Sequence, residues 1–230
     1  MSAEDEKRLA GEAAAGRVEN GMTVGLGTGS TAAWFVKALA ARLGPGFAVK
    51  GVPTSEATAA LARDLGIPLL TLDDARRIDL TVDGADEIGP GLSLIKGGGA
   101  ALLREKLVWE ASDRCLVIAD AAKRVETLGK FPLPIEVVAF GHKQTANRIT
   151  DVLAEHDIGM PPRLRLKDGQ PVVTDGGNLI YDAACGRIES PAALAEGLKS
   201  LTGVVEHGLF LDLADEGILG VGAAVQWLAP

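Results

Sequence analysis

The sequence predicts an α/β protein built from two differently ordered parts. Up to about residue 130, candidate strands and helices alternate, which is typical of an open sheet covered by helices. After residue 130 the order is strand, helix, strand, strand, helix, strand, the split βαβ order of a small α+β, ferredoxin-like domain. An apolar fraction of 47% with 29 glycines and only 4% aromatic residues also favours an α/β protein with small aliphatic packing and many tight turns.

The first part opens with a helix and then a strand, a glycine loop and a second helix. Ser2 stands three residues before Asp5, as in a capping box, so a helix is expected from there to Gly16. A strand at 22–24 then runs into the loop at 25–31, and a helix at 32–43 follows. The next predicted elements are a strand at 47–52, a helix at 55–65, a strand at 68–72 and a short helical connection at 73–77.

The glycine loop 25–31 reads Gly-Leu-Gly-Thr-Gly-Ser-Thr and predicts a phosphate site. Its glycines would admit a ligand, while Ser30, Thr31 and backbone N–H groups would supply donors. The spacing is not that of a dinucleotide fingerprint, no acidic residue closes the strand at 47–52, and no Gly-Lys-Ser/Thr follows. A phosphate monoester fits best, and a tight turn without a ligand is the alternative.

Two carboxylates come at the end of the next predicted strand. The apolar alternation from residue 78 stops at Asp83, and Asp86 follows three residues later. Ligands of open α/β sheets bind at this carboxyl edge, so the pair could orient sugar hydroxyls or act in acid and base steps. A metal would need more ligands than the neighbouring sequence offers. Caps of the next turn are the alternative interpretation.

Three consecutive glycines, Gly97, Gly98 and Gly99, follow Lys96 at a strand-to-helix junction. Each glycine costs backbone entropy, which indicates a need for bare backbone near a ligand. A helix starting near Gly99 or Ala100 would direct N–H groups at an anion. On that helix Glu105 lies at the boundary of an apolar stripe, and Lys123 lies just beyond a strand predicted at 114–119.

The second part follows a stiff connector at 131–134. Its predicted elements are strands at 135–140, 163–166, 178–183 and 204–210 and helices at 143–155 and 192–201, and 216–221 is a last strand that could return to the first domain. We therefore expect a catalytic domain of residues 1–130 joined by 211–230, and a small domain of residues 131–210.

Composition excludes several other classes. A net charge of −8 argues against a nucleic-acid footprint. His142, His156 and His207 are scattered without metal spacing or a Ser/His/Asp constellation, and Cys115 and Cys185 read as reduced buried thiols. No signal peptide or membrane span is visible, so a cytoplasmic protein is expected.

Three segments together resemble ribose-5-phosphate isomerase of type A: the loop 25–31, the carboxylate segment 83–87 and the glycine segment 96–106. The segment 129–134 resembles it as well, and the resemblance covers nearly the whole chain. It implies interconversion of ribose 5-phosphate and ribulose 5-phosphate in the pentose phosphate pathway, without a metal or organic cofactor. It also implies a Rossmann-like first domain, a smaller α+β second domain, and a homodimer or homotetramer.

The resemblance also implies roles for individual residues. Glu105 falls on the general base, and Asp83, Asp86 and Lys96 fall on the other catalytic positions. The substrate-binding positions fall on Lys7, Thr28, Gly29, Ser30, Thr31, Gly84, Ala85, Gly97, Gly98, Gly99 and Lys123. A base that moves one proton between C2 and C1 needs a higher pKa than an exposed Glu, so partial desolvation of Glu105 is expected.

Two other classes of protein remain as alternatives, and the first of them uses a similar glycine loop. One is a sugar-phosphate-sensing module, which would usually carry a basic DNA-binding helical domain, and none precedes Met22. The other is an acyl-CoA transferase or sugar-phosphate deaminase of the wider superfamily. The Lys96 to Lys106 stretch favours the isomerase over both.

Overall fold

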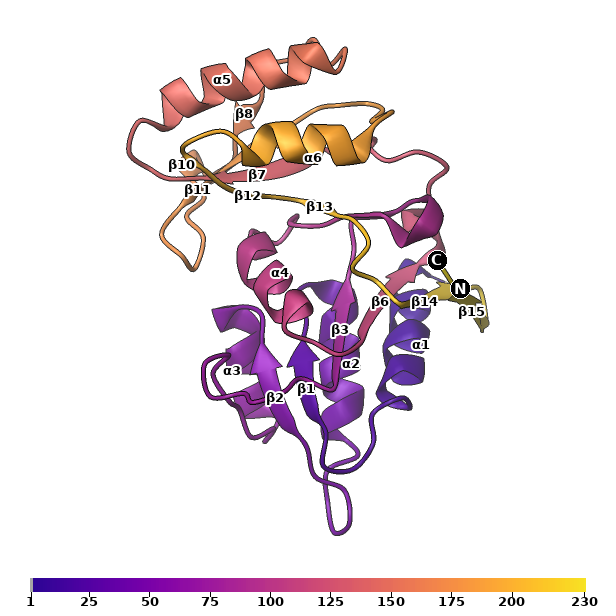
Figure 1. Cartoon of the computed structure of the whole chain (residues 1–230). Helices are drawn as coiled ribbons and strands as arrows, with labels where there is room; N and C mark the ends of the chain where they lie inside the picture. The colour runs from indigo at the N-terminus through magenta and orange to yellow at the C-terminus, as the bar shows by residue number, and fades with distance from the viewer. Residues whose placement is uncertain (1) are drawn as a thin grey trace. The chain divides into compact units, whose positions relative to one another are not determined.

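The computed structural model describes residues 2–230, and its internal contacts divide the chain into two compact units (Figure 1). The first unit contains the residues up to Ala85 together with Arg104–Arg124 and Asp212–Pro230. The second contains Asp86–Leu103 and Val125–Leu211.

The first unit is built on a six-stranded, mostly parallel sheet with the order β15-β14-β6-β3-β1-β2. Its strands are β1 (Thr23–Leu26), β2 (Lys50–Pro53), β3 (Leu80–Gly84), β6 (Cys115–Asp120), β14 (Glu216–Val221) and β15 (Ala224–Leu228). Only β15 runs antiparallel to its neighbour. The predicted strand at 216–221 is confirmed as β14, which pairs in parallel with β6 and places Ile218 opposite Ile118. The α/β class is therefore confirmed.

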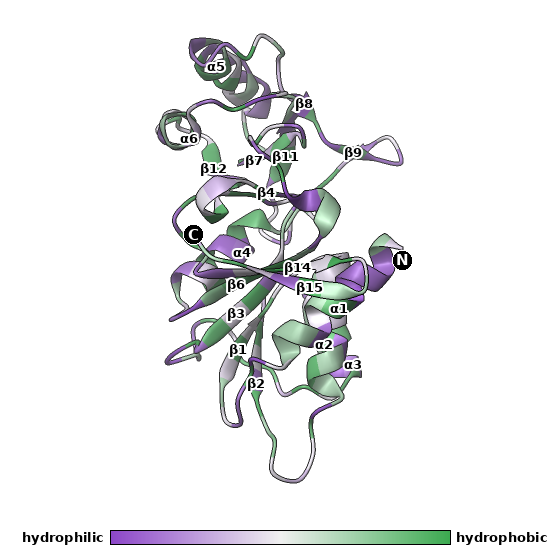
Figure 2. Ribbon diagram, turned by 90° about the vertical axis from the view of Figure 1, so that its right-hand side faces the viewer, coloured by the Kyte–Doolittle hydropathy of each residue, from purple (hydrophilic) through white to green (hydrophobic). Residues whose placement is uncertain are grey.

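Three helices cover one face of this sheet: α1 (Ala3–Ala15), α2 (Ser30–Ala40) and α3 (Glu56–Asp64) (Figure 2). The capping box at the start of α1 is confirmed, because Ser2 and Asp5 each accept the other's backbone N–H. Apolar side chains of α1 and α2 pack on those of the strands, and fully buried members of this core include Ala10, Phe35, Leu39, Val24 and Ile118. The core holds the carboxyl ends of β1 and β3 in fixed register.

Three local predictions in the first part need correction. Residues 68–72 form only one parallel bridge, Leu69 to Gly51, since proline at position 68 has no N–H for a ladder. The connection at 73–77 is a turn. Helix α4 begins at Leu102 (Leu102–Glu110), later than predicted, because Ala100 adopts a left-handed φ of 59° that an α-helix cannot include.

The second unit has a four-stranded antiparallel sheet in the order β12-β7-β11-β8. The elements in chain order are β7 (Leu133–Val137), α5 (His142–Glu155), β8 (Arg163–Leu164), β11 (Leu179–Ala183), α6 (Pro191–Lys199) and β12 (Val204–His207). Apolar residues of β7 and β11 pack with those of α5 and α6 in one buried core, which includes Ile135, Tyr181, Ile149 and Leu194. The hairpin of β9 (Leu166–Lys167) and β10 (Gln170–Pro171) was not predicted.

A three-stranded sheet also belongs to the second unit. It joins β4 (Glu87–Ile88), β5 (Leu94–Ile95) and β13 (Leu209–Phe210). The strand predicted at 204–210 is interrupted at Gly208, where a Cβ would lie 2.2 Å from the carbonyl oxygen of Lys96. Short 3-10 turns complete the structure, η1 (Pro90–Leu92) in this unit and η2 (Ala121–Lys123) in the first unit.

The boundaries of the compact units and of the expected domains differ at three places, the smallest being Leu211, which was expected with the first domain and groups with the second unit. Residues 86–103 were expected in the first domain, but β4 and β5 pair with β13 and with each other. Residues 125–130 also group with the second unit, since Leu128 packs in its core. Across residues 2–230, no helix combines the length and the apolar character that crossing a membrane requires.

Candidate active site

The glycine loop of the first unit is built around the carboxylate of Asp83. This side chain is fully buried, and its Oδ1 accepts the backbone N–H of Thr28 at 2.9 Å and that of Gly84 at 2.7 Å. A Cβ at Gly27 would lie 2.2 Å from the same oxygen. Gly27 therefore makes room for a protein carboxylate, whereas the sequence analysis gave the loop glycines to a ligand.

The end of the loop forms the start of α2. Gly29 has a φ of 110°, which favours glycine, and it precedes Ser30 as the N-cap residue. Ser30 is exposed and Thr31 is buried, so the hydroxyl of Ser30 is accessible at the N-terminus of α2, the end of a helix that favours an anion. Gly84 and Ala85 are half-buried at the end of β3.

Four hydroxyl groups lie beneath the loop, and sequence analysis did not assign three of them. Oγ1 of Thr28 lies 2.7 Å from that of Thr54, 2.8 Å from Oγ of Ser55 and 3.2 Å from Oγ1 of Thr58. Thr58 in turn donates its hydroxyl to the carbonyl of Gly27. We call these four residues the hydroxyl cluster. A Thr-Ser pair before a predicted helix was the available signal, but it reads equally well as a simple cap.

Three more predicted residues belong to the first unit. Glu105 lies in the first turn of α4 and is only 3% exposed. Lys123 is half-buried in η2, which Asp120 caps by accepting the N–H of Ala122 at 3.1 Å. Lys7 on α1 lies 3.5 Å from Oε2 of Glu4.

Asp86 and the triple-glycine segment meet in the second unit. Oδ2 of Asp86 accepts the N–H of Gly98 at 2.8 Å. A Cβ at Gly98 would lie 2.6 Å from Oδ1 of the same carboxylate, and Gly97 has a left-handed φ of 105°. Gly97 is therefore required by its backbone conformation, and Gly98 is required because a side chain there would collide with Asp86.

Lys96 precedes this segment and is 2% exposed. Its backbone N–H donates to the carbonyl of Gly208, and its Nζ lies 5.4 Å from the centroid of the Phe210 ring. That distance allows a cation–π contact, which accommodates a buried ammonium.

Arg165 also contacts the triple-glycine segment, and sequence analysis missed it. Its Nη1 donates to the carbonyl oxygens of Gly97 and Gly98, at 2.8 and 3.0 Å. The same guanidinium pairs with both carboxylate oxygens of Asp182. No spacing or motif points to Arg165, because it lies 67 residues beyond Gly98 in the chain.

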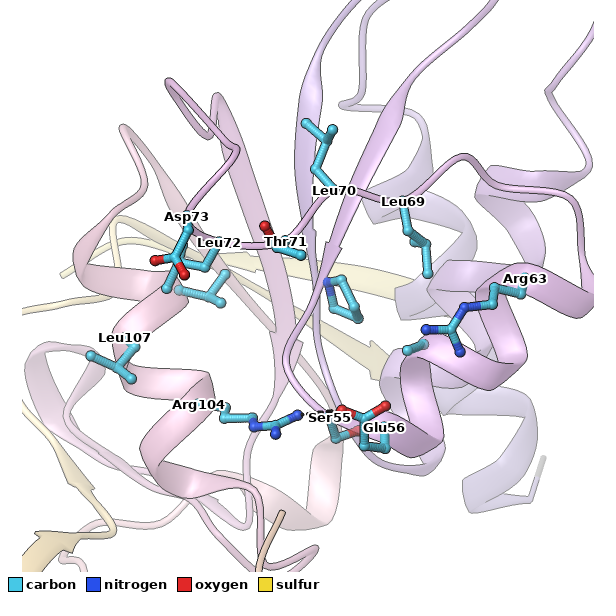
Figure 3. A pocket seen from close by; sticks show the side chains of 13 residues that line it. Ser55, Glu56, Arg63, Leu69, Leu70, Thr71, Leu72, Asp73, Arg104 and Leu107 are labelled. Carbon is cyan, nitrogen blue, oxygen red and sulfur yellow. Dashed lines mark hydrogen bonds and ion pairs between the residues drawn. The ribbon is translucent and has the colours of Figure 1, made fainter. Parts of the chain in front are cut away.

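A separate cavity of about 650 Å³ lies in the first unit beside α3 and α4 (Figure 3). Arg104 of α4 pairs there with Glu56 of α3 at 2.9 Å, and Leu107 lines the wall. None of the predicted site residues lines it. It touches the hydroxyl cluster only through Ser55.

Within residues 2–230, no group of three or more His, Cys, Asp and Glu side chains is arranged to hold a metal ion. His142 instead lies 2.7 Å from the hydroxyl of Tyr181.

Known proteins resemble this chain over its full length. The family model described as ribose 5-phosphate isomerase A (phosphoriboisomerase A) matches residues 50–223. Ribose-5-phosphate isomerase A of Caulobacter vibrioides (strain NA1000 / CB15N) is 72% identical, and the match covers 100% of both chains.

Two solved structures superimpose on this chain over its full length. A D-ribose-5-phosphate isomerase in complex with phospho-erythronic acid superimposes with a TM-score of 0.93 at 39% identity, covering 100% of both chains. Ribose 5-phosphate isomerase A from Methanocaldococcus jannaschii gives a TM-score of 0.91 at 37% identity, again covering 100% of both chains.

The fold and these matches together define an isomerase of the α/β class. The chain belongs to the ribose 5-phosphate isomerase A family, and the resemblance found in the sequence is thereby confirmed.

Proposed function

We propose that Glu105 is the general base by which this protein interconverts D-ribose 5-phosphate and D-ribulose 5-phosphate, the activity of its family. Glu105 takes the proton from C2 of the open-chain aldose, which leaves a cis-enediolate, and returns a proton to C1. The burial of Glu105, at 3% exposure, is the observation that supports this role most directly. Glutamate is rarely buried without a specific use, and desolvation makes a carboxylate a stronger base.

The negative charge that develops on the enediolate needs donors. We assign this task to Lys96 and to the N–H groups of the segment 97–99, among which that of Gly98 donates to Asp86 and so acts together with this carboxylate. Asp83 and Asp86 are the candidates for moving protons between O1 and O2 and for assisting ring opening. Both carboxylates accept backbone N–H groups, which holds each of them in a fixed orientation.

The phosphate of the substrate is assigned to the start of α2 and to two lysines. Ser30 and Thr31 supply hydroxyl and N–H donors, while Lys7 and Lys123 supply charge. Gly29, Gly84 and Ala85 are assigned to the same substrate site. The N–H and hydroxyl of Thr28 already bond within the protein, so we assign Thr28 to the support of Asp83. Binding energy from the distant phosphate positions the sugar for proton transfer.

The remaining expectations about architecture belong to this proposal. We take the first unit to be Rossmann-like and the second to be ferredoxin-like, on the basis of the βαββαβ order of β7 to β12. We propose that the catalytic domain consists of residues 1–130 together with 211–230, and that the small domain consists of residues 131–210. A cytoplasmic homodimer or homotetramer that needs no cofactor is part of the proposal. Light scattering of the purified protein measures the oligomeric state.

The test of the proposal is an assay with ribose 5-phosphate in the presence of a chelator, followed by detection of ribulose 5-phosphate. Glu105→Gln should lower kcat by about 10²- to 10⁴-fold, the usual contribution of a general base. Glu110→Gln is the matched control, since Glu110 lies exposed on the same helix. Binding of phospho-erythronic acid by Glu105→Gln would show that the variant is folded. Near-normal turnover by this folded variant would contradict the assignment.

A further inference from the structure

The triple-glycine segment, Gly97 to Gly99, can be rigid only if neighbouring residues hold it in place. Glycine loses more conformational freedom on ordering than any other residue, so three in succession need external support. On one side, Asp86 accepts the N–H of Gly98 at 2.8 Å. The support on the other side is Arg165, which bonds two consecutive carbonyl oxygens.

Arg165 is itself held firmly. Its Nε donates to Oδ2 of Asp182 at 2.8 Å and its Nη2 donates to Oδ1, which is the bidentate geometry that arginine and carboxylate favour. The two side chains are only 15% and 25% exposed, so solvent screens the pair weakly. The backbone of Arg165 is anchored as well, because its N–H donates to the carbonyl of Ile180 at 2.8 Å.

Peptide geometry converts this contact into an effect on the donors. In a trans peptide unit the C=O and the following N–H point in opposite directions. The carbonyls of Gly97 and Gly98 face Arg165, so the N–H groups of Gly98 and Gly99 are directed away from it. The observed bond from the Gly98 N–H to Asp86 agrees with this geometry. A cation on a carbonyl oxygen also polarises the peptide, which strengthens its N–H as a donor.

We propose that Arg165, held by Asp182, is a positioning residue that orients and polarises two N–H groups, that of Gly98 toward Asp86 and that of Gly99 toward the enediolate. This inference rests on the proposed function, which gives the glycine segment to the reacting end of the sugar. Arg165 acts only through the two peptide units. Its loss should therefore weaken stabilisation of the intermediate more than binding of the substrate.

The experiment measures kcat, KM and inhibition by phospho-erythronic acid for Arg165→Lys, Arg165→Ala and Asp182→Asn. Arg165→Lys keeps the charge but loses the planar guanidinium that bonds two carbonyls and Asp182 at once. We therefore expect kcat to fall roughly 10- to 100-fold while KM changes less than about threefold. Phospho-erythronic acid carries a carboxylate as well as a phosphate, and on this proposal the carboxylate uses the same N–H donors as the enediolate, so its inhibition constant should rise together with the loss in kcat/KM. Arg163→Lys is the matched control, because Arg163 is exposed two residues earlier.

Chemical rescue separates positioning from general stability. Guanidinium ion, added well below denaturing concentration, should restore part of the kcat of Arg165→Ala and should leave Arg163→Lys unchanged. Unaltered kcat and inhibition in folded Arg165→Lys would overturn the inference. If the Arg165 variants do not fold, Asp182→Asn decides the question, and wild-type kcat in that variant overturns it. Absence of isomerase activity in the unaltered protein would instead overturn the proposed function.

Discussion

The backbone N–H of Thr28 donates to Oδ1 of Asp83 across 2.9 Å, so a hydrogen bond ties the glycine loop after β1 to the carboxylate at the end of β3. Gly84 donates to the same oxygen, and the hydroxyl cluster supports Thr28 from below. Such loops are usually explained by their ligand. Here the loop also orients a buried carboxylate, and two variants test that conclusion.

Gly27→Ala should distort the glycine loop, because there is no room for a Cβ at this position. The new Cβ would lie 2.2 Å from Oδ1 of Asp83 and 2.5 Å from its Cα, and the backbone atom cannot rotate away. We expect a loss of about 1–3 kcal/mol in the free energy of unfolding, as for other overpacked sites. We also expect kcat to fall about tenfold or more. Urea denaturation and steady-state kinetics measure the two effects.

Gly44→Ala is the control for that variant. Its Cβ would meet no atom within 4 Å, so the free energy of unfolding should change by less than about 0.5 kcal/mol. Wild-type kcat in Gly27→Ala would show that the orientation of Asp83 does not limit the reaction.

Thr28→Val tests the hydroxyl cluster. Valine matches the shape of threonine but leaves the hydroxyls of Thr54, Ser55 and Thr58 with one partner fewer. Each of the three keeps another partner, so the loss should be that of an ordinary hydrogen bond, about 0.5–1.5 kcal/mol, and it should appear in urea denaturation together with a lower kcat. Thr28→Ser keeps the hydroxyl and should retain most of both quantities. Equal stability of the valine and wild-type proteins would contradict the role assigned to the cluster.

An element of the fold could be predicted correctly where residues within one short segment determine it. The capping box at Ser2, the glycine loop and the strand at 216–221 were all visible in the sequence. The start of α4 was not, because Ala100 takes a left-handed φ that its residue type does not announce. The placement of residues 86–103 depends on pairing with β13, more than 100 residues later.

The candidate site shows the same limit. Motifs identify Asp83, Asp86 and the glycine segments, since these residues are close together in the chain. The residues that hold them come from elsewhere: Thr54 and Thr58 support the first loop, and Arg165 supports the second. Long-range partners of backbone atoms leave no periodic or spacing signal, so only the structure reveals them.

Glu6 should affect substrate binding through η2. Its Oε1 accepts the N–H of Gly222 at 2.8 Å, and its Oε2 accepts that of Ala121 at 3.3 Å, at the start of the turn that carries Lys123. Glu6→Ala should lower the free energy of unfolding by about 2 kcal/mol, because charge-assisted bonds are lost. If Lys123 holds phosphate, KM should rise about tenfold for a lost contact of about 1.4 kcal/mol, with kcat little changed.

Glu12→Ala provides the comparison on the same helix. Glu12 accepts a bond from Arg8 in an exposed pair, so the variant should lose less than about 1 kcal/mol and keep its KM. A wild-type KM for Glu6→Ala would remove η2 from the phosphate site.

Cys185 should react slowly and with a marked dependence on pH. Burial raises the pKa of its thiol to about 11, and the nearby Glu87 carboxylate adds to the effect. Below that pH, the thiolate fraction and hence the rate of alkylation by iodoacetamide should rise about tenfold per pH unit. Mass spectrometry of the Cys115→Ser variant isolates this thiol, and alkylation in urea gives the rate for the unfolded chain.

The same shift makes a prediction for alkaline stability. An unfolded thiol has a pKa of 9.0 and the folded one about 11, so both states are protonated below pH 9 and stability there is unaffected. Between about pH 9 and 11 the unfolded chain releases its proton first, and the free energy of unfolding should fall as pH rises through this window. Cys185→Ala should remove that part of the decline. A thiol that titrates near pH 9 in the folded protein, with rapid alkylation at pH 8, would contradict the effect of burial.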